Sequence, residues 1–448
     1  MRLALARAAA ALSRRSGRGG TSLPGKLLLR MDSRAIARLS ARLPLGSVAI
    51  SATNGKTTTA TMAAAILERD GKRLVHNSAG ANMAGGIASA LLAASGDLGL
   101  FEVDEFYLPA VVAQLEPRAI VLGNLFRDQL DRYGELEAIA DRWAALLSGS
   151  SARLVLNADD PLIAGLGPAL RGGDAVPPLY FGIEDPAMAR SGLSHASDSK
   201  HCRRCGAPFR YERVYLGHLG VYRCPNGHAG RPAPDVSAHE IELRGVRSAS
   251  FTLRVPGTPG RRVELPLPGL YNVYNALAAA ALCSVLGVSL DGIAAGLESS
   301  VPAFGRAESI ALAGHELRIM LIKNPTGANE VLRTLALEPG EHHLIAALND
   351  GAADGRDVSW IWDADWETLA PRIGYATCTG KRAPELALRL KYAGVPTERI
   401  TVESRLERAL DDALSRARTT LYALPTYTAM LELRSVLVDR GQAGSSWL

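Results

Sequence analysis

The sequence contains few aromatic residues, no long apolar run and only five cysteines, and each of these scarcities excludes a class of protein. No stretch of about 18 uncharged apolar residues occurs, so we expect no membrane-spanning helix. Aromatic residues make up 5% of the chain and basic residues do not run in blocks, which argues against a nucleic-acid-binding protein. The net charge of +5 is too mild to favour that class by itself.

The cysteine pattern indicates a metal site and not a disulfide framework, because three of the five cysteines are clustered. Cys202 and Cys205 are spaced so that two thiolates on one turn reach a single tetrahedral zinc, and Cys224 follows further along. Gly227 occupies the place of a fourth cysteine, and His228 is the obvious substitute. The alternative is a loop that has lost its metal. Weaker candidates for the fourth ligand are His201 and His218. We predict one structural zinc site in a reducing cytoplasm.

The N-terminal third contains a stretch with the pattern of a phosphate-binding loop. An apolar strand at 48–51 leads into Asn54-Gly55-Lys56-Thr57-Thr58, and an alanine-rich helix follows. Backbone N–H groups of such a turn point at phosphate oxygens, Lys56 supplies a positive charge, and Thr57 can ligate Mg²⁺. Ile50 replaces the first glycine of the full motif, so an ordinary surface turn is the alternative.

Short apolar runs alternate with helical ones from about 46 to 165, which predicts an α/β domain with a parallel sheet. Polar residues follow each predicted strand, at the edge where open α/β sheets bind ligands. Glu102 is the predicted acidic Mg²⁺ ligand, with a solvated strand end as the alternative. For the polar groups after the third and fourth strands, helix capping is the alternative. The predicted strands cover 48–51, 98–103, 119–122 and 154–156.

Between about 191 and 234 the chain becomes poor in apolar runs and rich in Cys, His, Arg and Gly, which marks an insertion. Beyond it, strands at 240–243 and 249–255 lead to a helix on which Asn272 and Asn275 share one face. Their amides suit either an adenine edge or helix capping. Arg306 follows a glycine at a hinge, where a guanidinium can reach a phosphate.

The last third alternates strands and helices again, which predicts a second, smaller α/β sheet. The loop at 348–363 contains acids, an arginine and two tryptophans, more than a turn requires. The predicted strands of this part are 309–313, 318–322, 343–348, 373–377, 400–402 and 420–423.

These observations predict three parts. A basic arm or helix covers 1–44, a central ATP-binding domain covers 45–304, and a Rossmann-like domain covers 305–448. The zinc-ribbon-like insertion occupies about 199–233. The first twenty residues carry five arginines and no acid, so the arm either contacts an anionic membrane surface or packs as an ordinary helix on the next domain.

The order of several motifs resembles the Mur ligase superfamily, whose members make amide bonds through acyl phosphates with ATP and Mg²⁺. These motifs are Thr53–Thr57, 124–131, 157–161, 269–275 and Gly305-Arg306. Other motifs narrow the resemblance, over nearly the whole chain, to the MurT subunits of lipid II isoglutaminyl synthase. They are 21–25, 80–83, the cysteine insertion, Lys323-Asn324-Pro325 and above all 348–363.

The resemblance implies a role for individual residues. Lys56 and Thr57 would hold the ATP phosphates and Mg²⁺, with Glu102 as the acidic Mg²⁺ ligand. Asp357 matches the aspartate that family members lend to the Cys–His pair of their glutaminase partner, GatD, where it would orient the histidine. The implied nucleotide-binding set is Asn54, Gly55, Lys56, Thr57 and Thr58, with Asn272 near the adenine and Arg306 near the phosphates.

The implied reaction is the ATP-dependent amidation of the α-carboxylate of D-glutamate in the lipid II stem peptide, with ammonia from a GatD-type glutaminase. The implied location is the cytoplasm, peripheral at the inner face of the membrane that carries lipid II. Gln129 and Lys323-Asn324-Pro325 replace the histidine motifs of amino-acid-adding Mur ligases, which fits ammonia as the nucleophile. The alternatives are a Mur-type or folylpolyglutamate-type ligase that adds an amino acid without a glutaminase, and a zinc-ribbon nucleic-acid binder.

The remaining cysteines agree with an external source of ammonia. Glutamine hydrolysis by a thiol needs an accessible cysteine with a histidine at hand. Cys283 lies inside a predicted helix, and Cys378 lies at a strand end without a histidine nearby in the sequence. We therefore predict that the chain does not release ammonia by itself.

Overall fold

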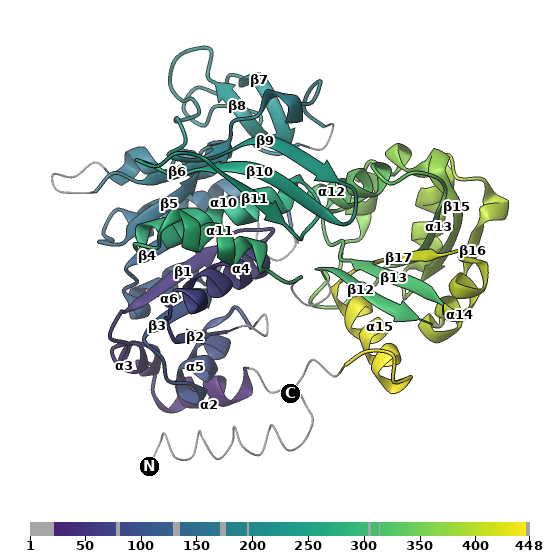
Figure 1. The fold of residues 1–448 in the computed structure, drawn as a ribbon, viewed down its shortest axis with the longest axis horizontal. Helices are drawn as coiled ribbons and strands as arrows, with labels where there is room; N and C mark the ends of the chain where they lie inside the picture. The colour runs from purple at the N-terminus through teal and green to yellow at the C-terminus, as the bar shows by residue number, and fades with distance from the viewer. Residues whose placement is uncertain are drawn as a thin grey trace.

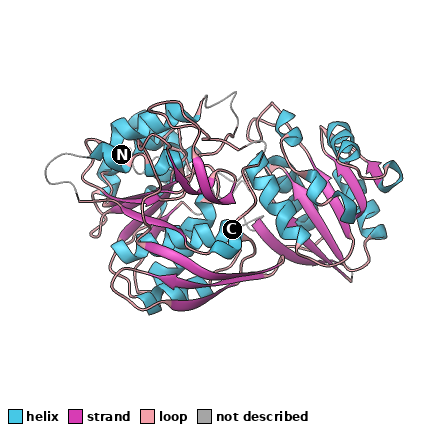
Figure 2. Ribbon diagram, turned by 90° about the horizontal axis from the view of Figure 1, so that it is seen from above, coloured by secondary structure: helices cyan, strands magenta, loops and turns pink. Residues whose placement is uncertain are grey.

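The computed structural model describes residues 22–77, 81–128, 135–170, 176–194, 197–302, 306–312 and 314–444. Two mixed, largely parallel sheets organise these residues, and helices cover both (Figures 1 and 2). The predicted α/β fold class is therefore confirmed. Residues 1–21 of the predicted basic arm lie outside the described part. Within that part, no helix combines the length and the apolar character needed to cross a membrane.

The larger sheet has nine strands in the order β11-β10-β9-β6-β5-β4-β1-β3-β2. Strands β1 to β6 and β9 are parallel, whereas β10 and β11 are antiparallel to their neighbours. Its strands are β1 (Ser47–Ser51), β2 (Leu74–His76), β3 (Leu98–Glu102), β4 (Ala119–Leu122), β5 (Arg153–Asn157), β6 (Leu179–Ile183), β9 (Val236–Arg244), β10 (Ser248–Arg254) and β11 (Arg261–Leu265).

Helices cover both faces of this sheet because alternate side chains of its strands are apolar on both sides. Val48 and Ile50 of β1 pack in one core with α4 (Lys56–Arg69), α10 (Leu270–Val285) and α11 (Leu290–Glu298). Ala49 faces the other core. The helices there are α2 (Leu23–Met31), α3 (Ala35–Ser40), α5 (Ala84–Ala93), α6 (Leu108–Leu115), α8 (Leu136–Leu147) and α9 (Pro161–Ala164).

The insertion forms its own two-stranded sheet, made of β7 (Arg210–Leu216) and β8 (Leu219–Arg223). It lies above the larger sheet in Figure 1, between β6 and β9 in the sequence. Its hairpin turn, Gly217-His218, points back toward the body of the protein, because the flanking side chains of Leu216 and Leu219 belong to the core that contains β1.

The smaller sheet has six strands in the order β12-β13-β17-β14-β15-β16, all parallel except the β12–β13 pair. Its strands are β12 (Arg306–Leu312), β13 (His315–Met320), β14 (His342–Ala347), β15 (Ile373–Thr379), β16 (Ile400–Val402) and β17 (Thr420–Pro425). Its helices are α12 (Pro325–Ala336), α13 (Ala383–Tyr392), α14 (Leu406–Arg416) and α15 (Tyr427–Asp439). All six predicted strands of this part are present, with ends shifted by a few residues.

The sequence patterns missed three strands of the larger sheet. β2 is only three residues long, and β6 has a glycine and two aromatic residues in place of a β-branched run. β11 is only five residues long, and three of them are charged. Each is defined by its pairing partner and not by its own sequence.

His76 of β2 provides a pH-dependent element of stability. Burial lowers its pKa from 6.5 to about 4, so the folded chain resists protonation where the unfolded chain accepts a proton. The contribution of His76 to the free energy of unfolding is therefore fully present above pH 6.5. It falls as the pH drops toward 4, by at most about 3 kcal/mol. We expect His76→Leu to reduce the acid-side loss in urea unfolding between pH 7 and pH 4.5. An identical loss in the variant would contradict this assignment.

Candidate active site

The predicted phosphate-binding loop connects β1 to α4 at the carboxyl edge of the larger sheet. Gly55 has φ of 89°, and a Cβ atom built there would lie 2.0 Å from Oδ1 of Asn275. Only glycine fits this position, because both the backbone conformation and the neighbouring amide exclude a side chain. The helix Lys56–Arg69 then begins directly after Gly55, so its first N–H groups point at the loop.

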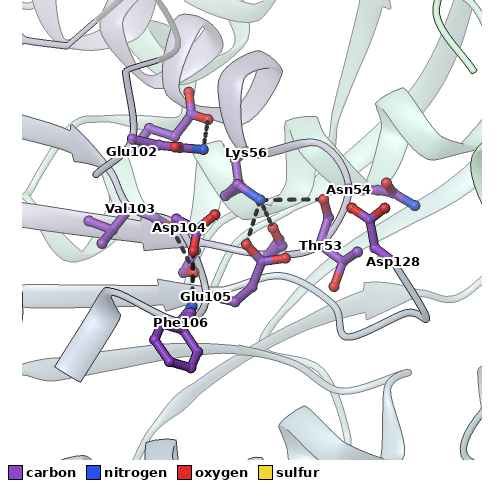
Figure 3. Close-up of polar contacts among 12 residues, drawn as sticks. Thr53, Asn54, Lys56, Glu102, Val103, Asp104, Glu105, Phe106 and Asp128 are labelled. Carbon is purple, nitrogen blue, oxygen red and sulfur yellow. Dashed lines mark hydrogen bonds and ion pairs between the residues drawn. The ribbon is translucent and has the colours of Figure 1, made fainter. Parts of the chain in front are cut away.

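Lys56 is buried under the loop and is held by an acid that the sequence patterns did not single out. Its Nζ donates to Oε2 of Glu105 at 2.8 Å and to the carbonyl oxygens of Ala52 and Thr53 (Figure 3). Burial alone would lower the pKa of Lys56, but Glu105 and Glu102 outweigh it, and the pKa lies above its ordinary value. The ammonium group of Lys56 is therefore charged and can bind an anion.

Glu102 and Thr57 lie together, as the Mg²⁺ prediction requires. Thr57 Oγ1 donates to Glu102 Oε2 at 2.8 Å, and Asn82 Nδ2 donates to Glu102 Oε1 at 3.4 Å. Asn77 holds the Glu102 backbone through both its amide atoms. The pair offers one hydroxyl and one carboxylate oxygen, ligands that suit Mg²⁺, beside the phosphate-binding turn. The side chain is almost fully buried, which argues against a merely solvated strand end.

The second sheet completes the site. Asn324 exchanges hydrogen bonds with Asn54 of the loop at 3.0 and 3.2 Å, and Lys323 forms an ion pair with Asp128. Burial raises the pKa of Glu105, but Lys56 and Lys323 outweigh it, so the pKa falls below its ordinary value. A cavity of about 360 Å³ lies between these groups and is lined by residues of both sheets.

The two asparagines of α10 line the same cavity. Asn272 Nδ2 donates to the carbonyl oxygen of Pro268, and Asn275 Nδ2 donates to Oδ1 of Asn272 at 3.0 Å. Neither amide accepts a backbone N–H of the helix in the described residues, so helix capping does not explain them. The capping alternative holds elsewhere, since Asp160 after β5 accepts from the backbone of Leu162 and Ile163. The side chain of Arg306 lies outside the described part.

The cysteine cluster forms as predicted. One donor atom each from Cys202, Cys205, Cys224 and His228 lies within 4.8 Å of the others. The Sγ atoms of Cys205 and Cys224 are 3.5 Å apart, close to the edge of about 3.8 Å that zinc–sulfur bonds give in a tetrahedron. The donor set therefore fits zinc. The weaker candidates are not part of this cluster: the backbone of His201 pairs with Pro208 in an isolated bridge, and His218 is buried at the hairpin turn.

The loop after β14 divides into a fixed part and a projecting part. Asp354 is buried and accepts from the backbone and hydroxyl of Thr428 at the start of α15. Asp357 is exposed, with its Oδ1 accepting from the backbone N–H of Ser359 at 2.8 Å. Hydrogen bonds from Ser359 lower the pKa of Asp357, which keeps this exposed group ionised.

Neither cysteine outside the cluster is placed to act as a nucleophile. Cys283 and Cys378 are fully buried in α10 and β15. Burial raises the pKa of both thiols, that of Cys378 to about 12, so neither forms a thiolate at neutral pH.

Family comparisons agree with both halves of this geometry. Residues 50–283 match the family described as Mur ligase middle domain, and residues 321–430 match MurT ligase C-terminal. The chain is 33% identical over 446 residues to "Lipid II isoglutaminyl synthase (glutamine-hydrolyzing) subunit MurT" of Staphylococcus aureus strain N315, covering 99% of this chain and 98% of that one. It is 35% identical over 438 residues to the protein of the same name from Streptococcus pneumoniae R6, covering 95% and 94%.

Solved structures show the same fold. A pseudomurein peptide ligase type C from Methanothermus fervidus superposes with a TM-score of 0.70 at 25% identity, covering 90% of this chain and 80% of that one. The MurF ligase of Thermotoga maritima in complex with ADP superposes with a TM-score of 0.61 at 16% identity, covering 91% and 84%. The second similarity bears on the fold alone.

Proposed function

The chain belongs to the MurT family of the Mur ligase superfamily, and from that premise we propose that it uses ATP to amidate lipid II. The γ-phosphoryl group of ATP passes to the α-carboxylate of D-glutamate in the stem peptide, which gives an acyl phosphate and ADP. Ammonia then attacks the carbonyl carbon, phosphate leaves, and loss of a proton yields D-isoglutamine. The observation that carries the proposal is the cavity where the phosphate-binding loop meets Lys323 and Asn324 of the second sheet.

We assign the phosphate end of the cavity to the loop. The backbone N–H groups from Asn54 to Thr58 and the ammonium of Lys56 would hold the phosphates, and Thr57 and Glu102 would hold Mg²⁺, which neutralises charge on the transferring group. When ATP binds, the ammonium of Lys56 would leave Glu105 and contact a phosphate oxygen. Asn272 and Asn275 would lie toward the adenine, and Arg306 toward the phosphates.

We assign the supply of ammonia to a partner. Both thiols outside the metal cluster are buried and protonated, so this chain does not hydrolyse glutamine with them. Asp357 lies in the loop after β14 as an exposed, ionised carboxylate, which suits a group that completes the Cys–His pair of a GatD-type glutaminase. Cys202, Cys205, Cys224 and His228 would hold a structural zinc ion.

The test is amidation of purified lipid II by the chain together with its glutaminase partner, ATP and glutamine, read by mass spectrometry. We expect amidated lipid II, ADP and glutamate in equal amounts. A complex that consumes ATP and glutamine but leaves the lipid II carboxylate unchanged would refute the proposal. Activity of the chain alone with an added amino acid would favour the amino-acid-adding alternative.

We also propose that α2 docks the chain on the membrane that carries lipid II. Its exposed side carries Leu23 and Leu27, 63% and 38% exposed, flanked by Lys26 and Arg30. Exposed arginines continue along the same region at Arg34, Arg38 and Arg42. Apolar side chains surrounded by cations are the pattern that binds an anionic lipid surface.

The membrane proposal predicts weaker vesicle binding when two of these charges are removed. Arg30→Gln with Arg34→Gln should lower affinity for phosphatidylglycerol vesicles about thirtyfold, since each cation near the surface contributes about 1 kcal/mol. Sedimentation with the vesicles measures it. Arg405→Gln with Arg408→Gln removes two exposed cations from the start of α14 and should leave binding unchanged. Equal losses in both double variants would show that only net charge matters.

A further inference from the structure

The tip of the insertion hairpin is built into the cavity of the ligase. We define the hairpin tip as Leu216–Leu219. Leu216 and Leu219 are buried at 4% and 1% exposure and line the same cavity as the phosphate-binding loop. A Cβ atom on Gly217 would lie 3.0 Å from the ring of Phe126 and 3.4 Å from Cγ2 of Thr326. The tip is therefore wedged between the larger sheet and α12 of the smaller one.

His218 places a polar ring in the interior, and neither ring nitrogen has a hydrogen-bond partner among the described residues. Its side chain is fully buried, its ring lies 4.8 Å from the ring of Phe126, and its Nε2 lies 3.3 Å from Oδ2 of Asp160. Its backbone carbonyl accepts from the hydroxyl of Tyr211. Packing of the hydrophobic core does not by itself require an imidazole at this turn. An apolar side chain would fill the same space without the cost of removing a polar ring from water.

A short path leads from the tip to the phosphate-binding loop. The backbone N–H of Phe126 donates to Oγ1 of Thr53 at 3.1 Å, and that hydroxyl in turn approaches the carbonyl of Phe126 at 3.3 Å. Thr53 lies one residue before Asn54, whose N–H donates to Asn124. His218 therefore packs against Phe126, which belongs to the same segment that holds one side of the phosphate-binding loop.

The opposite end of the hairpin is the cysteine cluster. β8 ends at Arg223, directly before Cys224, and Cys205 lies five residues before the start of β7. A lone two-stranded hairpin is at best marginally stable, so its shape depends on attachments at its ends. Metal ligation by the cluster would supply that attachment at the outer end, because metal-binding free energy becomes folding free energy in small metal-bound units.

From these contacts we propose that the hairpin tip is a positioning element of the nucleotide site, and that metal in the cysteine cluster holds it there. Leu216 and Leu219 form one wall of the cavity, and His218 supports Phe126 and through it the phosphate-binding loop. The inference rests on the proposed ATP and zinc sites. It gives the insertion a role in nucleotide affinity.

The test measures nucleotide affinity and metal content of the full chain, without partner or lipid II. We expect Leu219→Ala to weaken binding of a fluorescent ATP analogue about tenfold, as a shortened side chain in a binding pocket typically does. Chelation should weaken it similarly, and added Zn²⁺ should restore it in the natural chain but not in Cys205→Ser. Arg210→Ala, on an exposed position of β7, should change neither quantity.

Unchanged ATP affinity in Leu219→Ala or in the metal-free chain overturns the inference, and so does a chain that binds no zinc. If Leu219→Ala yields no folded protein, Leu219→Val makes a smaller change. In a separate amidation assay with lipid II and ammonium salts, it should still raise the KM for ATP while leaving the KM for ammonia unaltered. A variant with lower stability but normal ATP affinity identifies a purely structural hairpin and also overturns it. Amidation itself is tested separately, so failure here leaves the proposed function standing.

Discussion

Replacing Lys56 by methionine is expected to lower the rate of ATP-dependent amidation about a thousandfold, because it removes the buried positive charge that faces the transferred phosphoryl group. Lys56 and Glu105 are both more than nine-tenths buried and lie 2.8 Å apart. The variant would leave Glu105 charged, buried and unpaired, which should cost about 3 kcal/mol of stability. Steady-state release of ADP measures the first effect and urea unfolding the second.

A double variant separates these two effects. Lys56→Met with Glu105→Gln removes both charges of the pair, so it should recover most of the lost stability. Its amidation rate should stay low, since no cation then meets the phosphates. Lys56 begins α4, and Lys72 lies just after the other end of that helix. Lys72→Met is therefore the matched control and should retain activity. A double variant that recovers activity together with stability would mean that Lys56 acts only in folding.

The sequence allowed the clustering of the residues that we assign to ATP and Mg²⁺ to be predicted, because local patterns set their positions. Lys56 and Thr57 belong to one short turn, and Glu102 follows a strand that the parallel arrangement brings to the same edge. Glu105 was not singled out, although it lies in the same acidic run, because its partner is fixed only when β3 packs beside β1. Asn275 was treated as a helix-face amide, and its contact with the loop appears only in the packed structure.

The role that we propose for the insertion was the hardest feature of the site to predict from the sequence. Its composition indicated metal ligands, and the cluster Cys202, Cys205, Cys224 and His228 forms as predicted. Nothing in the local pattern places Leu216 and Leu219 in the core of another sheet, because two leucines beside a turn are common in exposed hairpins. Their burial depends on a strand order in which β6 and β9 pair across the insertion.

Changing Asp357 to asparagine is expected to lower glutamine-dependent amidation about ten-thousandfold, as the same change does in a comparable triad, while amidation from added ammonium salts stays normal. The carboxylate is exposed and ionised, so its removal leaves no buried charge and should not change stability. Ser359 donates to Oδ1 of Asp357, and its backbone N–H remains in Ser359→Ala. That variant should therefore show a much smaller loss.

The reaction with added ammonium salts distinguishes between two roles for Asp357. If Asp357 serves the partner's Cys–His pair, the defect appears only with glutamine, and the complex still assembles on a sizing column. If Asp357 instead binds lipid II or ATP, both nitrogen sources fail together, and the assignment is wrong. Glu398→Gln removes another exposed carboxylate, from the short helix before β16, and should leave both reactions intact. Loss of assembly would instead place Asp357 in the surface that contacts the partner. The exposed ring pair of Trp362 and Tyr392 would then be further candidates for that surface, because exposed aromatic side chains commonly anchor protein interfaces.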